Sequence, residues 1–117
     1  MELDLGRVRA LASPDTEAGR ASLAELFGAY VDHMRPALAL MRDAIAEGDS
    51  GQIRALAHDQ KGASSMVGAR RIAAALAAIE AAPGDSAIVH PAVAEIALSL
   101  ARVEKEIRAL VGGTGTP

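Results

Sequence analysis

Apolar residues recur every three or four positions along most of the chain, which is the spacing of an amphipathic α-helix. The alternation that predicts a β-strand has no useful length anywhere. Helices are expected at residues 3–11, 13–48, 49–67, 69–82 and 91–111. Four long helices joined by short turns predict an all-α fold, an up-down-up-down four-helix bundle with a short extra N-terminal helix.

The predicted helix ends carry residues that suit those positions. Asp49 can cap the third helix with its carboxylate, and Pro14 is tolerated in the first turn of the second. Gly68 fits a left-handed residue after the third helix. A Pro-Gly-Asp turn separates the last two helices, so we place His90 in a loop before a helix that begins at Pro91.

Composition favours one helical domain with an aliphatic core. The chain has 117 residues, half of them apolar, which is enough for a single core. It holds one Phe, one Tyr and no Trp, so Leu, Ile, Val, Met and Ala must fill the interior. We expect a single domain over residues 1–111 and a flexible C-terminal tail over residues 112–117.

Charge and cysteine content exclude several classes of function. The formal net charge is −3 and the sequence has no basic stripe, so nucleic acid is not an expected partner. Without cysteine there is no disulfide, thiolate metal site or cysteine nucleophile. We find no signal peptide and no apolar run of membrane-spanning length. A cytoplasmic protein without membrane contact is therefore expected.

His58 is expected on the solvent side of the third helix. With about 100° per residue, His58 lies roughly 150° from the centre of the core side. That core side collects Ile53, Leu56, Ala57, Gln60, Ser64 and Val67. Residues at spacings −4, +3, +4 and +7 share the surface with His58. These neighbours are Arg54, Lys61, Gly62 and Ser65.

Most of these features also have a purely structural interpretation. Exposed histidines, cations and hydroxyls are common on the polar side of an amphipathic helix. Gly62 is harder to explain, because Gly inside a helix costs about 1 kcal/mol relative to Ala. Its outward position argues against close helix packing as the reason. We infer that a partner outside the domain requires the missing side chain.

Other kinds of site find little support in the sequence. The chain has no Glu-x-x-His pair of the di-metal bundles, no His-Glu-x-x-His zinc motif and no phosphate-binding Gly-rich loop. A Ser-His-Asp triad stays open by residue count, but nothing places the three residues together. Metal and cofactor sites are therefore not expected.

Residues 56–65, Leu-Ala-His-Asp-Gln-Lys-Gly-Ala-Ser-Ser, resemble the signature of histidine-containing phosphotransfer (HPt) domains. In that signature an Ala-His pair is followed by Lys-Gly at +3 and +4 and then by small or hydroxyl residues. The next helix is similar as well, through Ile72, Leu76 and Glu80. The resemblance extends over about residues 3–110.

The resemblance implies a phosphoryl carrier rather than an enzyme with its own kinase or ATPase activity. His58 would take a phosphoryl group from a phosphorylated receiver domain and pass it to a response-regulator aspartate. Lys61 would contact the phosphoryl oxygens, and Gly62 would leave room for the partner to dock. From their spacing around His58, Arg54 and Ser65 are also expected where the partner docks. The implied partners are receiver domains and a hybrid histidine kinase, and the protein is expected to be a monomer. It would bind no cofactor, since the Mg²⁺ belongs to the receiver.

One departure and several alternatives accompany this interpretation. The family usually has an apolar residue where Gln60 stands on the core side, so this amide needs a partner such as Ser64 or a backbone group.

An HPt-fold adaptor that docks a receiver or kinase without carrying phosphate remains an alternative, as does an unrelated helical adaptor. A histidine-kinase dimerisation domain is disfavoured. Asp59 supplies the acidic residue expected there, but no proline follows before Pro83.

Overall fold

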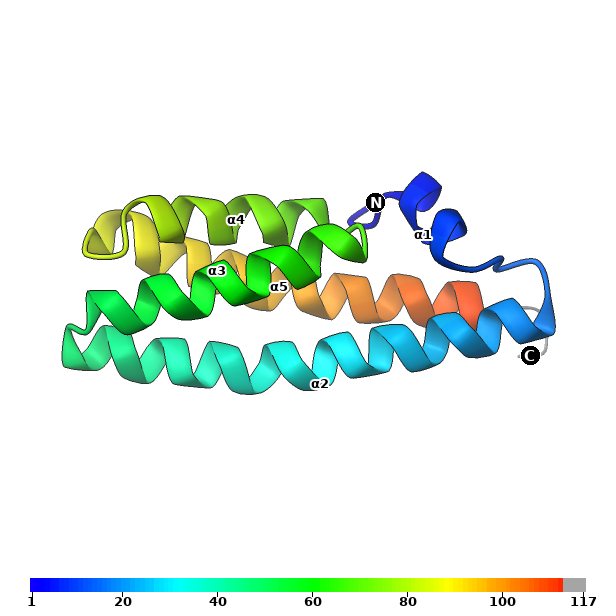
Figure 1. The fold of residues 1–117 in the computed structure, drawn as a ribbon, viewed down its shortest axis with the longest axis horizontal. Coiled ribbons are helices and arrows are strands. Elements are labelled where there is room, and N and C mark those ends of the chain that lie inside the picture. The colour runs from blue at the N-terminus through cyan, green and yellow to red at the C-terminus, as the bar shows by residue number, and fades with distance from the viewer. Residues whose placement is uncertain (113–117) are drawn as a thin grey trace.

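The structure, a computed structural model, describes residues 1–112 and contains five helices. They are α1 (Leu5–Leu11), α2 (Glu17–Glu47), α3 (Ser50–Met66), α4 (Arg70–Ala81) and α5 (Ser86–Gly112). From α2 to α5 each helix packs antiparallel to the next, and α2 also packs on α5, which closes the bundle (Figure 1). The predicted four-helix bundle with a short N-terminal helix is confirmed.

One cluster of buried side chains fills the bundle along its length. Phe27 and Tyr30 form an edge-to-face pair with ring centroids 6.4 Å apart. Aliphatic side chains make up most of the remaining core, including Leu23, Met34, Met41, Ile72, Leu76, Ile79, Ile96 and Val103. Buried alanines on all four long helices allow the backbones to approach closely.

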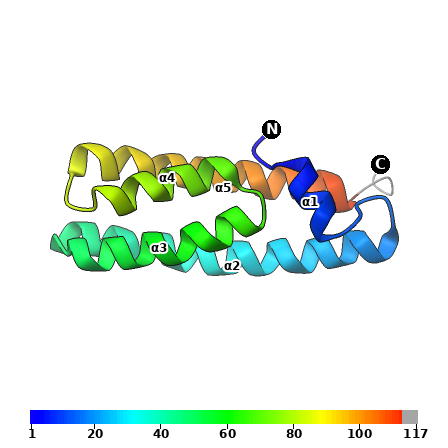
Figure 2. The ribbon, with the colours of Figure 1, turned by 45° about the horizontal axis from the view of Figure 1, so that its top comes forward.

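The N-terminal segment lies over the part of α2 and α5 that extends beyond α3 and α4 (Figures 1 and 2). Val8 of α1 is fully buried there. Leu3, predicted as helical, instead forms an isolated β-bridge with Ala69. The Glu106 carboxylate accepts hydrogen bonds from the N–H groups of Glu2 (2.7 Å) and Leu3 (3.0 Å), which keeps this segment extended.

Helix α2 begins later than the predicted start at Ser13 and Pro14. Its N-cap is Thr16, whose hydroxyl accepts a hydrogen bond from the Gly19 N–H at 2.9 Å. This cap satisfies an N–H group at the helix start and leaves Pro14 in the preceding turn. The turns around α3 agree with the prediction more closely, since Asp49 caps the helix through the Gln52 N–H at 3.1 Å.

Helix α5 begins at Ser86 rather than Pro91, so the prediction that His90 lies in a loop is wrong. The Asp85 carboxylate accepts a hydrogen bond from the Ala87 N–H at 3.0 Å and starts the helix one turn early. Pro91 is tolerated because the helix carbonyl that loses its partner belongs to Ala87, which is exposed to solvent.

Helix α5 is long and apolar enough to cross a membrane, with a mean hydropathy of 1.3 in its most apolar window. The expectation that no segment has this property is therefore wrong. Five of its apolar side chains pack in the bundle core, and 33% of the most apolar window is buried. They are Val93, Ile96, Leu100, Val103 and Ile107. Gly112, predicted to begin the tail, is the last residue of this helix, and residues 113–117 lie outside the described part of the chain.

Candidate functional site

The helical phase of α3 is as the apolar spacing predicts. Ile53, Ala57 and Ser64 are buried, whereas the His58 side chain is 67% exposed. Arg54, Gly62 and Ser65 are also exposed, and Lys61 keeps 37% of its side chain in solvent. The structure therefore brings all five predicted site residues to the outer surface of one helix.

A carboxylate from the neighbouring helix joins two of these residues. Glu80 of α4 places Oε2 2.7 Å from Nδ1 of His58 and Oε1 2.6 Å from Nζ of Lys61. Its side chain is only 23% exposed, so it lies in the seam between α3 and α4. The sequence resemblance includes Glu80 but assigns it no role. A helical wheel of α3 cannot reveal this contact, because the partner comes from another helix.

The charge of Glu80 determines which imidazole nitrogen of His58 carries the proton. The hydrogen bond from Lys61, followed by that from His58, lowers the pKa of the Glu80 carboxyl below its usual value. Glu80 is therefore an ionised acceptor without a proton to donate. In the neutral imidazole, Nδ1 must then carry the hydrogen, and Nε2 keeps a free lone pair. An exposed nitrogen nucleophile with a fixed tautomer results.

Arg54 and Ser65 share the surface but not the contact network. Within residues 1–112, the side-chain hydrogen bonds and ion pairs of His58 and Lys61 go to Glu80, and the side chains of Arg54 and Ser65 form none. Their side chains are free to meet a partner. No group of three His, Asp or Glu side chains in the described chain could hold a metal ion.

The comparisons with known proteins agree with this geometry. The model of the Hpt domain family matches residues 25–110, which is well over half of the chain. The chain belongs to the Hpt domain family. This family acts in phosphotransfer within phosphorelays. The searches of curated proteins and of solved structures returned no match.

Two glycines in helix interiors of this Hpt domain face open space. A Cβ atom built on Gly62 of α3 would meet no atom of the protein within 4 Å, and the same holds for Gly28 of α2. Internal packing therefore does not require glycine at either position. Gly62 lies one turn from His58, whereas Gly28 lies on another helix and provides a matched control position.

Gln60 is the departure from the family pattern, and its amide is poorly satisfied. Its Oε1 atom is buried without a hydrogen-bond partner. Ser64, an expected partner, instead forms a buried hydrogen bond of 2.7 Å with the Tyr30 hydroxyl. Burial raises the pKa of Tyr30 to about 12, so this hydroxyl stays neutral. An unpaired buried acceptor of this kind costs about 1–3 kcal/mol.

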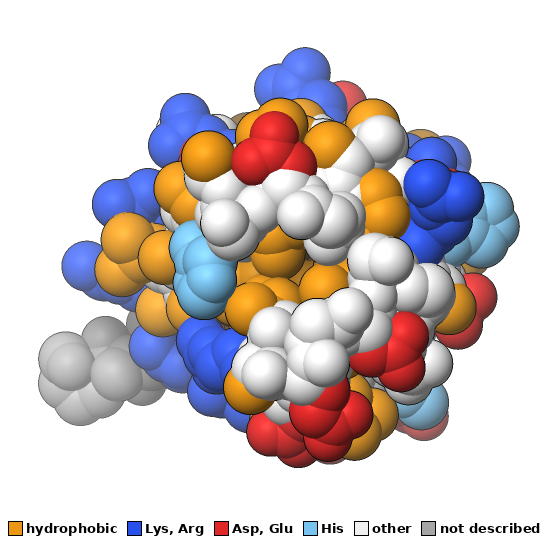
Figure 3. Space-filling view, turned by 90° about the vertical axis from the view of Figure 1, so that its left-hand side faces the viewer, with side chains coloured by type: hydrophobic (Ala, Val, Ile, Leu, Met, Phe, Trp, Pro, Cys, Tyr) orange, Lys and Arg blue, Asp and Glu red, His pale blue; other side chains and the backbone are white. Residues whose placement is uncertain are grey.

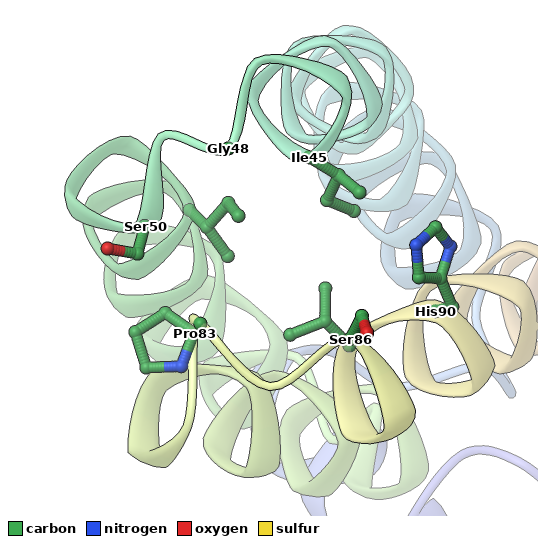
Figure 4. A pocket seen from close by; sticks show the side chains of 9 residues that line it. Ile45, Gly48, Ser50, Pro83, Ser86 and His90 are labelled. Carbon is green, nitrogen blue, oxygen red and sulfur yellow. The ribbon is translucent and has the colours of Figure 1, made fainter.

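The other two histidines lie away from the α3–α4 seam. His33 is exposed on α2, and His90 lies at the rim of a hollow of about 200 Å³ at the end of the bundle (Figures 3 and 4). Ile45, Ile53 and Val89 line the inside of this hollow. No Lys, Arg, Asp or Glu lines it, so it lacks the charged groups that phosphoryl chemistry needs.

The Lys61–Glu80 pair predicts a specific titration. We expect Lys61→Ala to raise the pKa of the Glu80 carboxyl towards its usual value, because Lys61 is the main cause of the lowered pKa. In the wild type, the stability that this pair contributes is present above the usual pKa and is lost as the pH falls through the lowered one. Carboxyl carbon chemical shifts measured against pH would report both values. Arg54→Ala is the control and should leave the Glu80 pKa unchanged. An unchanged Glu80 pKa in Lys61→Ala would contradict the pairing.

The unpaired amide predicts a stabilising substitution. Gln60→Leu should raise the free energy of unfolding by about 1 kcal/mol, because it removes a buried acceptor without a partner. Urea unfolding monitored by circular dichroism measures this change. Gln52→Leu, at an exposed position on the same helix, should change stability by less than about 0.5 kcal/mol. A clear loss of stability in Gln60→Leu would show that the amide has good partners.

Proposed function

We propose that His58 is the phosphoacceptor of this Hpt domain and carries the phosphoryl group on Nε2. The observation that supports this most directly is the Glu80 contact, which occupies Nδ1 and leaves Nε2 exposed as the nucleophile. The family supplies the reaction class. A docking adaptor without phosphate transfer would have no need for a fixed tautomer on an exposed histidine.

The transfer step follows from the chemistry of the two partners. The Nε2 lone pair attacks the phosphorus of an aspartyl phosphate on a receiver domain, and the bond between phosphorus and the aspartate oxygen breaks. The aspartate leaves as a carboxylate, and the imidazole becomes positively charged because Nδ1 keeps its hydrogen. The Glu80 carboxylate at 2.7 Å stabilises that charge. The reverse step passes the phosphoryl group to a second receiver.

Lys61 provides the positive charge that the reaction needs on this side of the complex. Phosphoryl transfer depends mainly on positioning and on neutralising charge on the phosphoryl oxygens. Lys61 is bound to Glu80 yet partly exposed, so its ammonium group can also contact an incoming phosphoryl group. Arg54 is a second cation on the same surface. The Mg²⁺ would come with the receiver, and this chain would need no cofactor of its own.

The surface around His58 suits close approach by a folded partner. Gly62 has no side chain to obstruct the imidazole, and Ser65 and Arg54 offer polar contacts beside it. The partners are receiver domains and a hybrid histidine kinase that supplies the first phosphoryl group. We place the domain in the cytoplasm, where it acts as a monomer with one partner at a time.

Removing the acceptor imidazole tests this proposal. His58→Ala should abolish phosphorylation by a phosphorylated receiver while the helical circular dichroism stays unchanged. In the wild type, the label should be acid-labile and alkali-stable, as phosphohistidine is. His33→Ala and His90→Ala are the matched controls and should be labelled normally. Labelling that persists in His58→Ala, or is lost in a folded control, would refute the assignment.

Removing the cation separates charge stabilisation from folding. Lys61→Ala should slow transfer by roughly ten- to a thousand-fold, which corresponds to the loss of ~1.4–4 kcal/mol of transition-state stabilisation. Single-turnover transfer from a phosphorylated receiver measures this rate. Lys105→Ala, which removes the only other lysine, should have no effect. An unchanged rate in Lys61→Ala would make this residue an ordinary surface charge.

Filling the gap at Gly62 tests whether the partner needs it. Gly62→Gln should fold as well as the wild type or better, by up to about 1 kcal/mol. It should nevertheless lose most receiver binding and transfer, since the new side chain would lie beside the imidazole. Gly28→Gln makes the same change at an equally open helix position and should transfer normally. Normal transfer by Gly62→Gln would show that docking does not require the gap.

A further inference from the structure

The C-terminal half of α3 is held in the core by a polar side chain. The buried apolar side chains of this helix are Ile53 and Ala57, and both precede His58. After His58, the buried side chain of the helix is Ser64, while Ala63 is only partly buried. Apolar contacts are non-directional, so they hold α3 against the bundle without fixing its rotation.

Ser64 is bonded across the helix interface to α2. Its hydroxyl lies 2.7 Å from the hydroxyl of Tyr30, and both residues are buried. Within residues 1–112, no other side-chain hydrogen bond joins α2 to α3. A hydrogen bond weakens steeply when its length or angle departs from the preferred values. This bond can therefore specify the rotation of α3, which the apolar contacts leave loosely defined.

The contact of α3 with α4 tolerates little rotation. Ser64 lies about 120° around the helix from His58, whose Nδ1 is 2.7 Å from the Glu80 carboxylate. The tip of a side chain lies about 5–6 Å from the helix axis, so a rotation of about 10° moves it by about 1 Å. A displacement of that size along the bond takes His58 out of hydrogen-bonding distance of Glu80.

We propose that the hydrogen bond between Tyr30 and Ser64 sets the rotation of α3 and thereby positions His58 against Glu80 for phosphoryl transfer. This inference rests on the proposed function of His58. Tyr30 and Ser64 are buried, so they are positioning residues that act through the contact between His58 and Glu80. The alternative is that the pair contributes to the stability of the core alone.

A double-mutant cycle separates positioning from stability. Tyr30→Phe and Ser64→Ala each leave one buried hydroxyl without its partner, so each should lower the melting temperature. The double variant removes both hydroxyls and keeps the apolar parts of the two side chains. Its melting temperature should therefore return close to that of the wild type. Positioning predicts that His58 is nevertheless misplaced in the double variant.

Two measurements report the position of His58 in these variants. The first is the pKa of the Glu80 carboxyl, which Lys61 and then His58 lower in the wild type. In the double variant this pKa should rise towards its usual value, because both contacts become weaker. The second is single-turnover transfer from a phosphorylated receiver. Its rate at saturating receiver should fall by about five- to a hundredfold. The receiver concentration that gives half the maximal rate should stay the same, since every surface side chain is retained.

Ser99→Ala is the matched control. Ser99 of α5 is fully buried, and its hydroxyl has no hydrogen-bond partner in the described part of the chain. This variant removes a buried serine hydroxyl without breaking a bond, so the Glu80 pKa and the transfer rate should stay unchanged. The same changes in Ser99→Ala as in the double variant would overturn the proposal.

The proposal requires both changes in the double variant. A wild-type Glu80 pKa, or a wild-type transfer rate, would overturn it and leave the pair a role in stability alone. Tyr30→Phe keeps the aromatic ring in the core and gives the same two measurements if the double variant does not fold. The Glu80 titration needs no phosphoryl transfer, so it tests the rotation of α3 independently of the reaction. Labelling of His58→Ala by a phosphorylated receiver would refute the phosphoacceptor assignment instead.

Discussion

The rotation of α3 about its own axis is the constraint on which both the core and the site depend. The rotation that buries Ile53, Ala57 and Ser64 also turns His58 to solvent and Lys61 towards α4. A shift by one residue would turn the helix by about 100° and move these groups off their partners. Two hydrogen bonds fix the rotation from either side. Ser64 bonds to Tyr30 of α2, and His58 bonds to Glu80 of α4.

These two contacts also explain how so small a domain can present a reactive group with a defined protonation pattern. The buried Ser64–Tyr30 pair is neutral and satisfied, so it adds a directional contact to an otherwise aliphatic core. The Glu80 contact is partly exposed and charged, so it orients the imidazole and keeps Nε2 available. The rest of the reaction centre, namely the aspartate and the Mg²⁺, would come from the receiver. In this account the Hpt domain is one half of an active site that exists only in the complex.

The sequence predicts the features that depend on a single helix and misses those that depend on two. The apolar period of α3 places His58 and Gly62 outward and Gln60 inward, because all these positions share one helical wheel. The Glu80 contact joins residues from different helices, and no spacing within one helix indicates it. The predicted starts of α2 and α5 are wrong for a local reason. Thr16 and Asp85 accept hydrogen bonds from N–H groups at the helix starts, whereas Pro14 and Pro91 are only compatible with a first turn.

The central claim is that Glu80 holds the Nδ1 hydrogen of His58 so that Nε2 accepts the phosphoryl group. The most direct measurement is long-range proton–nitrogen NMR of the ¹⁵N-labelled domain before and after phosphorylation, with phosphorus–nitrogen coupling to locate the bond. The account predicts that the hydrogen of the neutral form of the His58 imidazole lies on Nδ1, and that phosphorus then couples to Nε2. A hydrogen on Nε2 in the free domain, or a phosphoryl group on Nδ1 or on another residue, would contradict it.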